Sequence, residues 1–98
     1  MSHITFQWDT KKDSINQKKH NVSFQEAKTV FYDEKARLIH DPEHSDSEDR
    51  FVLLGLSGSL RLLVVVHSYK EQDENIRIIS ARKATKIESR YYFKWWKK

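Results

Sequence analysis

The segment IRIISARKAT, residues 76–85, contains the side chains best suited to chemistry on a phosphate. Arg77, Arg82 and Lys83 stand there among apolar and small residues. A guanidinium group can hold a phosphate through two parallel hydrogen bonds, which a lysine ammonium cannot match. The segment therefore indicates either a strand that carries cations for an anionic ligand or a buried strand with an ordinary solvated edge.

Metal-independent cleavage of RNA is one reaction that such residues suit. In this reaction the 2′-hydroxyl attacks the adjacent phosphorus while a base removes its proton, and an acid protonates the departing 5′-oxygen. Arginine would stabilise the negative charge that grows on the phosphoryl oxygens, and histidine, lysine or a carboxylate would carry the protons. The same groups suit plain phosphate binding equally well, so both interpretations stay open.

Alternation along the predicted strand decides which of these side chains can meet, because successive residues point to opposite faces of a sheet. Strict alternation would place Arg77 and Arg82 on opposite faces. A bulge near Ser80–Ala81, or a strand that ends before Arg82, would bring the two arginines to one face. Without such a break, only one of them belongs to the site.

Other chemistries find no support in the sequence. The chain has no cysteine, which excludes a disulfide framework, a thiolate metal site and a cysteine nucleophile. It has 2 glycines and neither of the common glycine-rich phosphate-binding motifs. The 5 histidines lack the close spacing that preorganises a metal site, and we interpret the one local cluster, HDPEH at residues 40–44, as a solvated turn. We therefore expect no metal and no cofactor.

Charge is distributed unevenly along the 98 residues. Residues 1–50 carry 8 Lys+Arg against 10 Asp+Glu, a balance of −2, whereas residues 51–98 carry 10 against 4, a balance of +6. A basic half favours nucleic acid or an acidic protein as partner, beside the plainer interpretation of a basic solvated surface. No apolar run reaches the length of about 18 residues that a membrane helix needs, and we find no signal peptide. We expect a cytoplasmic protein without a membrane partner.

The N-terminal third predicts a strand and two helices that would position these cations. HITFQW, residues 3–8, alternates apolar and polar side chains as a half-buried strand does. Asp9 suits the N-cap of a mostly solvated helix over residues 10–20. Ser23 and Glu26 have the spacing of a capping box, in which each side chain binds the backbone amide of the other residue, and they open a second helix.

The remaining segments predict an antiparallel sheet. A short strand precedes Pro42, and short turns join three further strand candidates, residues 51–56, 60–69 and 76–82. Consecutive strands with such short links must be antiparallel. The fold class is therefore α+β, an antiparallel sheet of about four strands with helices packed against it, in a single domain of residues 1–98.

A last helix follows this sheet. Thr85 and Glu88 repeat the capping-box spacing, and Ile87, Tyr91 and Trp95 then recur on one stripe. We expect the helix to pack mostly on its own core, with a partner protein touching its outer side.

Four segments together resemble the BrnT family of type II toxins. They are FQWDTKKDSINQKKHNVSFQEAKTVF, HSDSEDRFVLLG, LRLLVVVHSY and IRIISARKATKIESRYY, in that order and spacing, and the resemblance runs from about Ile4 to Tyr92. It implies a compact RelE-like ribonuclease that cleaves RNA and arrests translation. It also implies a hetero-oligomer with a BrnA-like antitoxin, a ribbon-helix-helix DNA-binding protein, and contact with operator DNA only through that antitoxin.

The resemblance also implies which positions recur across the family. The recurring positions of the family fall on Trp8, Asp9, Lys12, Asn16, Lys19, His20, His44, Ser45, Arg50, Arg77, Ser80, Arg82, Glu88 and Arg90. The chain departs from the family pattern at Asn21, where glycine is usual, although asparagine tolerates the left-handed backbone that ends a helix. The C-terminal tail FKWWKK extends beyond the pattern.

From this set and from the residue chemistry we expect two groups of site residues. The catalytic group is Lys19, His20, Arg50, Arg77 and Arg82, and the substrate-binding group is Lys12, His67, Lys83 and Arg90. Either His20 or His67 could carry a proton, and the assignment of base and acid stays open. Asp9 and Glu88 are interpreted as helix caps, Trp8 as core, and Ser80 as a residue that only satisfies a backbone group.

Two alternatives to a ribonuclease stay open. A non-catalytic module could use the basic C-terminal half to bind RNA or an acidic protein, with strong salt dependence and no turnover. A subunit of a larger complex could instead pack the aromatic segment YYFKWW, residues 91–96, on a partner.

Overall fold

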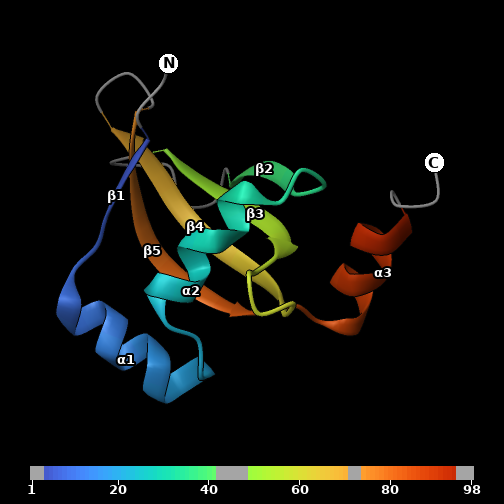
Figure 1. Ribbon diagram of the computed structural model, residues 1–98, viewed down its shortest axis with the longest axis horizontal. Coiled ribbons are helices and arrows are strands. Elements are labelled where there is room, and N and C mark those ends of the chain that lie inside the picture. Colours follow the sequence, from blue (N-terminus) through green and yellow to red (C-terminus); the bar gives the residue numbers. More distant parts are fainter. Residues whose placement is uncertain (1–3, 42–48, 71–73, 95–98) are drawn as a thin grey trace.

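A computed structural model describes residues 4–41, 49–70 and 74–94 of the chain. Helices and strands follow one another as shown in Figure 1. Their bounds are β1 Thr5–Gln7, α1 Thr10–His20, α2 Phe24–Thr29, the 3-10 helix η1 Val30–Tyr32, β2 Arg37–Asp41, β3 Arg50–Leu56, β4 Leu62–Lys70, β5 Asn75–Lys83 and α3 Lys86–Lys94.

A five-stranded sheet of order β1-β5-β4-β3-β2 forms the centre of the fold. Strands β2 to β5 pair antiparallel with their sequence neighbours, as the short turns predict. Strand β1 pairs parallel with β5, which makes the sheet mixed. The prediction of an α+β fold is confirmed, whereas the purely antiparallel sheet of about four strands is corrected. A parallel pair is possible here because two helices and three strands separate β1 from β5 in the chain.

One face of the sheet packs against α2 and η1, which cross in front of the strands in Figure 1. Burial of apolar side chains from both layers is what holds this packing together. The main core lies in this layer and consists of Val22, Phe24, Ala27, Val30, Leu53, Leu63, Val65, Ile78 and Ala81. We call this side of the sheet the helical face.

The opposite face is covered only in part, by α3. A smaller cluster forms there from Tyr92 of α3 with Leu54 and Val64 of the sheet. Strand β4 is therefore apolar toward both faces, as expected of a central strand.

Strand β5 contains an extra residue at Ile79. Val66 of β4 pairs with Ser80, but the next residue, His67, pairs with Ile78, so Ile79 has no partner position on β4. Such a bulge reverses the alternation of side chains beyond it. Alternation along the strand predicted that Arg77 and Arg82 share a face only if β5 has a bulge near Ser80–Ala81 or ends before Arg82. The bulge is present.

The bulge gives one face of the sheet a row of polar side chains. Arg77, Ser80 and Arg82 pair with Ser68, Val66 and Val64, which alternate on the same side of β4. Arg50 lies on that side too, two residues before Val52, which pairs with Val66. We call this side, with Arg50, Arg77, Ser80 and Arg82, the arginine face.

Helix α1 forms where the sequence predicts it and completes an edge of the sheet. Asp9 caps it, because its Oδ1 accepts hydrogen bonds from the backbone amides of Lys11 at 2.7 Å and Lys12 at 3.3 Å. Asn21 ends it with a left-handed φ of 57°, as expected for this asparagine. The helix runs beside β5 beyond the short strand β1 (Figure 1).

Asn16 of α1 replaces the neighbour that β5 lacks at that edge. Its amide donates to the carbonyls of Ala81 and Val22, both at 2.8 Å, and its Oδ1 accepts from the amide of Ala81 at 3.1 Å. The side chain is almost fully buried, so these bonds form away from water. Because β1 pairs with β5 only as far as Arg77, the backbone of Ala81 depends on Asn16.

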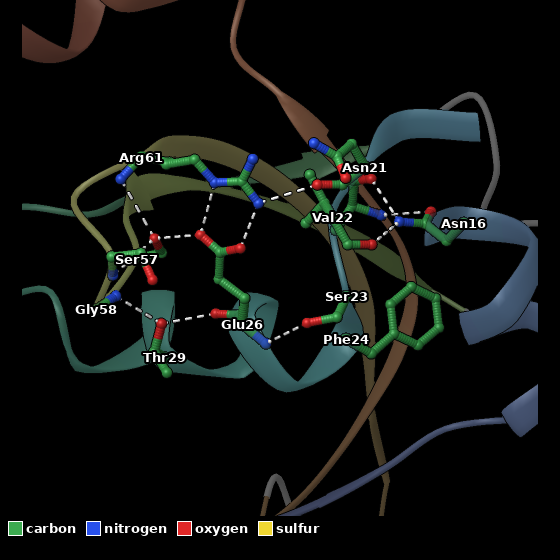
Figure 2. A network of polar contacts seen from close by, with 12 residues as sticks. Asn16, Asn21, Val22, Ser23, Phe24, Glu26, Thr29, Ser57, Gly58 and Arg61 are labelled. Atoms are coloured by element: carbon green, nitrogen blue, oxygen red, sulfur yellow. Dashed lines mark hydrogen bonds and ion pairs between the residues drawn. The ribbon is translucent and has the colours of Figure 1, made fainter. Parts of the chain in front are cut away.

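The two predicted capping boxes differ in outcome. Thr85 and Glu88 form both reciprocal bonds, from the Thr85 amide to Glu88 at 2.8 Å and from the Glu88 amide to Thr85 at 3.2 Å. Ser23 accepts from the amide of Glu26 at 3.0 Å, but the carboxylate of Glu26 binds Arg61 instead of returning to its own helix (Figure 2). The capping box of Ser23 and Glu26 is therefore half formed.

The phase of α3 differs from the expectation. Tyr92 is its buried side chain, whereas Ile87 and Tyr91 are exposed, so the predicted stripe faces outward rather than toward the core. Trp95 lies outside the described residues. In the part of the chain that the structure describes, no helix is long and apolar enough to cross a bilayer.

Replacing Asn16 with alanine should lower the free energy of unfolding by about 2–4 kcal/mol, because it leaves one buried amide and two carbonyls without partners. Urea denaturation followed by circular dichroism measures this loss. The matched control is Gln17→Ala, an exposed position on the same helix, which should cost less than about 0.5 kcal/mol. Equal effects of the two substitutions would contradict the role assigned to Asn16.

Candidate functional site

A groove lies between α1 and the bulged part of β5. It has a volume of about 200 Å³ and is lined by Lys12, Ile15, Asn16, Lys19, His20, Ile79 and Ser80. The five residues of α1 recur at helical spacing, so they share one side of the helix. The structure therefore brings three expected residues, Lys12, Lys19 and His20, together with Ser80 of the arginine face. We call this hollow the α1–β5 groove.

Arg77 lies in an adjoining part of the same surface. It lines a depression with Gln7, Trp8 and Asp9, where β1 passes into α1. Ser80 of the α1–β5 groove follows Arg77 on the same face of β5, and only one pairing position on β4 separates their partners. A phosphate held by Arg77 would thus lie near the lysines and the histidine of the groove.

Arg82 stands farther along the same face and is already engaged. Its two terminal nitrogens donate to the two carboxylate oxygens of Glu88, each at 2.8 Å. These hydrogen bonds are the largest cause that lowers the pKa of Glu88 to about 2 and raises the pKa of Arg82. The strand rise of about 3.3 Å per residue puts Arg77 and Arg82 about 13 Å apart along the bulged strand. They share a face, but Arg82 is held by Glu88 and lines neither the α1–β5 groove nor the depression around Arg77.

Arg50 completes the arginine face at the beginning of β3. The neighbouring β4 lies between β3 and β5, so Arg50 and Arg77 are separated by two strand spacings, about 10 Å. Arg50 is half-buried and remains within reach of a ligand that extends across the strands. Arginines on one face of a sheet supply positive charge to an anionic ligand that extends across the strands.

His67 is separated from these residues. It pairs with Phe51 and lies on the helical face, where it is fully buried against Phe31, with ring centroids 4.7 Å apart. Its Nδ1 lies 3.1 Å from the carbonyl of Val65 and its Nε2 lies 3.1 Å from the hydroxyl of Tyr69. Burial lowers its pKa to about 4. His67 was expected to bind substrate, but this position makes it a neutral core side chain.

Two further expected residues lie away from the groove. Lys83 pairs with Leu63 of the helical face, and its charge helps to lower the pKa of Glu26, after the larger effect of a hydrogen bond from Arg61. Arg90 is exposed on α3. Neither lines the α1–β5 groove.

Part of the sequence expectation falls outside the described residues. His44 and Ser45 lie there, as do Pro42 and Glu43 of the predicted turn HDPEH. Across residues 4–41, 49–70 and 74–94, no group of three or more His, Asp or Glu residues is placed to hold a metal ion.

A polar network that the sequence did not predict lies next to the C-terminal end of α1 (Figure 2). Glu26 accepts from Arg61 Nε at 2.9 Å and from the Ser57 hydroxyl at 2.7 Å. Arg61 also donates to the carbonyl of Asn21 at 3.0 Å, directly after the last residue of α1. The bonded residues lie 31 to 40 positions apart in the chain, so no local sequence pattern predicts these contacts. The network holds the α1–α2 turn, and with it His20, against the β3–β4 turn.

Comparison with known proteins agrees with this fold. A family model for BrnT, the ribonuclease toxin of type II toxin–antitoxin systems, matches residues 8–88. The chain belongs to the BrnT family. It is therefore a ribonuclease toxin of the type II class, which implies RNA as its substrate and an antitoxin as its partner.

A solved structure supports the fold independently. The 1.1 Å crystal structure of the Brucella abortus ribonuclease toxin BrnT matches with a TM-score of 0.61 and 23% identity. The match covers 88% of this chain and 100% of the other. No curated protein matches the chain. The arrangement of helices around the bulged sheet is thus a BrnT arrangement, as the sequence resemblance predicted.

The buried position of His67 predicts how stability depends on pH. Its folded pKa of about 4 lies below the ordinary 6.5, so the unfolded chain takes up the proton first. The contribution of neutral His67 to the free energy of unfolding is complete above pH 6.5. It is lost as the pH drops toward 4, by about 3 kcal/mol in all. We expect His67→Asn to lack this part of the acid dependence, measured by urea denaturation at pH 7, 6, 5 and 4. Parallel curves for the two proteins would contradict it.

Proposed function

We propose that this toxin is a metal-independent endoribonuclease whose active site is the α1–β5 groove together with Arg77. The observation that carries the proposal is the meeting of Lys12, Lys19, His20 and Ser80 in one hollow beside that arginine. These groups supply proton carriers and cations within one surface, without a metal ligand set. The elements that hold them are the bulge at Ile79 and helix α1.

The proposed reaction begins when the RNA 2′-hydroxyl attacks the adjacent phosphorus. Lys19 and His20 carry the two protons, one from the attacking hydroxyl and one to the departing 5′-oxygen. Arg77 stabilises the charge on the phosphoryl oxygens, and its guanidinium matches them with two parallel donors. The products are a 2′,3′-cyclic phosphate and a free 5′-hydroxyl. Cleaving RNA in this way would inhibit translation.

The remaining cations are assigned to flanking phosphates. Lys12 lines the groove one turn from Asn16, and Arg50 and Arg82 lie along the arginine face at distances that suit neighbouring nucleotides. Arg82 would bind a phosphate in competition with Glu88, because both of its terminal nitrogens donate to that carboxylate and its side chain is 42% exposed.

The partner is proposed to be a BrnA-like antitoxin of the ribbon-helix-helix class that acts in the cytoplasm. The toxin would then reach operator DNA only as part of the hetero-oligomer with this antitoxin. Family membership supports an antitoxin of some kind, and the basic surface of the toxin supports an acidic contact region on it.

Paired lysine substitutions test the site. Lys19→Ala should lower kcat/KM for RNA cleavage by about 10²- to 10³-fold if Lys19 carries a proton, and Lys12→Ala by about tenfold through one lost phosphate contact. The matched controls are Lys18→Ala and Lys11→Ala, which remove the same charge from positions outside the groove and should stay within about twofold. If each control variant lost as much activity as its groove variant, the lysines would act only through their general positive charge, and the proposed site would be contradicted.

The chemical mechanism is tested with RNA in excess EDTA. Cleavage should persist, and the new 5′ fragment should end in a cyclic phosphate that mass spectrometry detects. A substrate with a 2′-deoxy nucleotide at the cleavage position should stay intact. Arg77→Ala should lower the rate by about 10²- to 10³-fold, with part of the rate kept in Arg77→Lys. RNA binding without any cleavage would favour the non-catalytic alternative.

A further inference from the structure

The outer side of α3 exposes apolar side chains. Ile87 is 76% exposed, Tyr91 42% and Phe93 40%, although each is large and apolar. Ile87 and Tyr91 are four residues apart, so they stand one above the other on the helix. Aliphatic and aromatic side chains held together in this way on a surface mark an interaction site more often than a chance arrangement.

Positive charge flanks these side chains. Lys86, Arg90 and Lys94 are exposed on the same helix, and at about 100° per residue all three lie on one side of Ile87. The acidic residue of α3, Glu88, is neutralised by Arg82 through two hydrogen bonds of 2.8 Å. The outer side of α3 is therefore apolar with a cationic flank. We call it the α3 surface, defined by Lys86, Ile87, Arg90, Tyr91 and Lys94.

The helix presents this surface rigidly, because it is held at two points. Tyr92 is fully buried and donates to Asp33 at 2.5 Å, and Glu88 joins the helix to Arg82 of β5. A partner would therefore meet a surface that is already ordered, and it would not lose binding free energy in ordering it.

The chemistry of the α3 surface disfavours two occupants. A second copy of the chain would bring the same cations together, and such contacts between like charges cost binding free energy. Single-stranded RNA gains affinity by stacking its bases on aromatic rings, but the guanidinium of Arg37 lies over the Tyr91 ring, 5.7 Å from its centroid, and Ile87 offers no ring to a base. Apolar side chains flanked by cations fit an acidic polypeptide segment that carries apolar side chains.

We propose that the α3 surface binds an acidic, amphipathic segment of a partner protein through Ile87 and Tyr91. The inference rests on the proposed function only in taking the antitoxin as that partner. Helix α3 begins three residues after the end of β5, so a segment bound there lies beside Arg82 and the arginine face. Its carboxylates could extend along that face in the places of RNA phosphates, which would block the α1–β5 groove.

A selection from displayed peptides tests the proposal with the full-length protein. A library of random 20-residue peptides is selected on immobilised protein, with Ile87→Gln/Tyr91→Gln protein as the competitor in solution. We expect the selected peptides to be acidic and to place leucine, isoleucine or aromatic residues three or four positions apart. Synthesised peptides should lose at least tenfold in affinity for the double variant. The matched control is Leu60→Gln, which changes an equally exposed aliphatic side chain at the β3–β4 turn and should not alter binding.

Each outcome decides the proposal. No enrichment over the double variant, or enrichment of basic peptides, would overturn it. Loss of single-stranded RNA affinity in the double variant would also overturn it, because the surface would then bind nucleic acid. Circular dichroism of each variant checks that it is folded. Peptide binding does not require turnover, so a protein that binds peptides through α3 but cleaves no RNA would reject the proposed ribonuclease site and keep this inference.

Discussion

The unpaired residue Ile79 in β5 determines which side chains of that strand can act together. Val66 and His67 are consecutive in β4, yet their partners Ser80 and Ile78 are separated by this residue. Without the extra residue, Arg77 would face the buried core when Arg82 faces solvent, or the reverse, and a buried unpaired guanidinium is very costly. The bulge lets the apolar side chains Ile76, Ile78 and Ala81 stay in the core while the polar ones share the other side. The position of the α1–β5 groove follows from this single irregularity.

Side chains complete the sheet at both ends, where strands are too short to do so. Asn16 satisfies the backbone of Ala81 beyond the end of β1, and Asp33 accepts from the amide of Leu56 at 2.8 Å beyond the last pair of β2, Arg37 with Leu54. Ala81 and Leu56 thereby have backbone partners that the edge strands β1 and β2 do not supply. One of these side chains belongs to α1, the helix that carries half of the proposed site.

The sequence predicted the parts of this fold that depend on local patterns. Asp9 as a cap, Asn21 in the left-handed region and the condition on the β5 bulge could all be argued from neighbouring residues. The placement of His67 could not, because alternation gives a strand residue two possible faces and the choice depends on which layer Phe31 and Phe51 reach. The bonds of Glu26 to Arg61, 35 residues away, follow from the path of the chain and not from any motif. Likewise the phase of α3 was set by Tyr92 reaching Asp33, a contact across 59 residues, rather than by the stripe of Ile87 and Tyr91.

The hydrogen bonds from Arg82 to Glu88 give the arginine face and α3 a shared component. If Arg82 binds an RNA phosphate as proposed, that phosphate competes with the carboxylate of Glu88 for the same guanidinium, so binding of one weakens the hold of the other. Linkage makes such an effect reciprocal: whatever fastens α3 in place would lower the affinity of Arg82 for phosphate by the same factor by which phosphate loosens α3. The C-terminal helix would then be thermodynamically coupled to the proposed RNA site through one ion pair. A ligand that touches only α3 would for this reason change the affinity of the toxin for RNA.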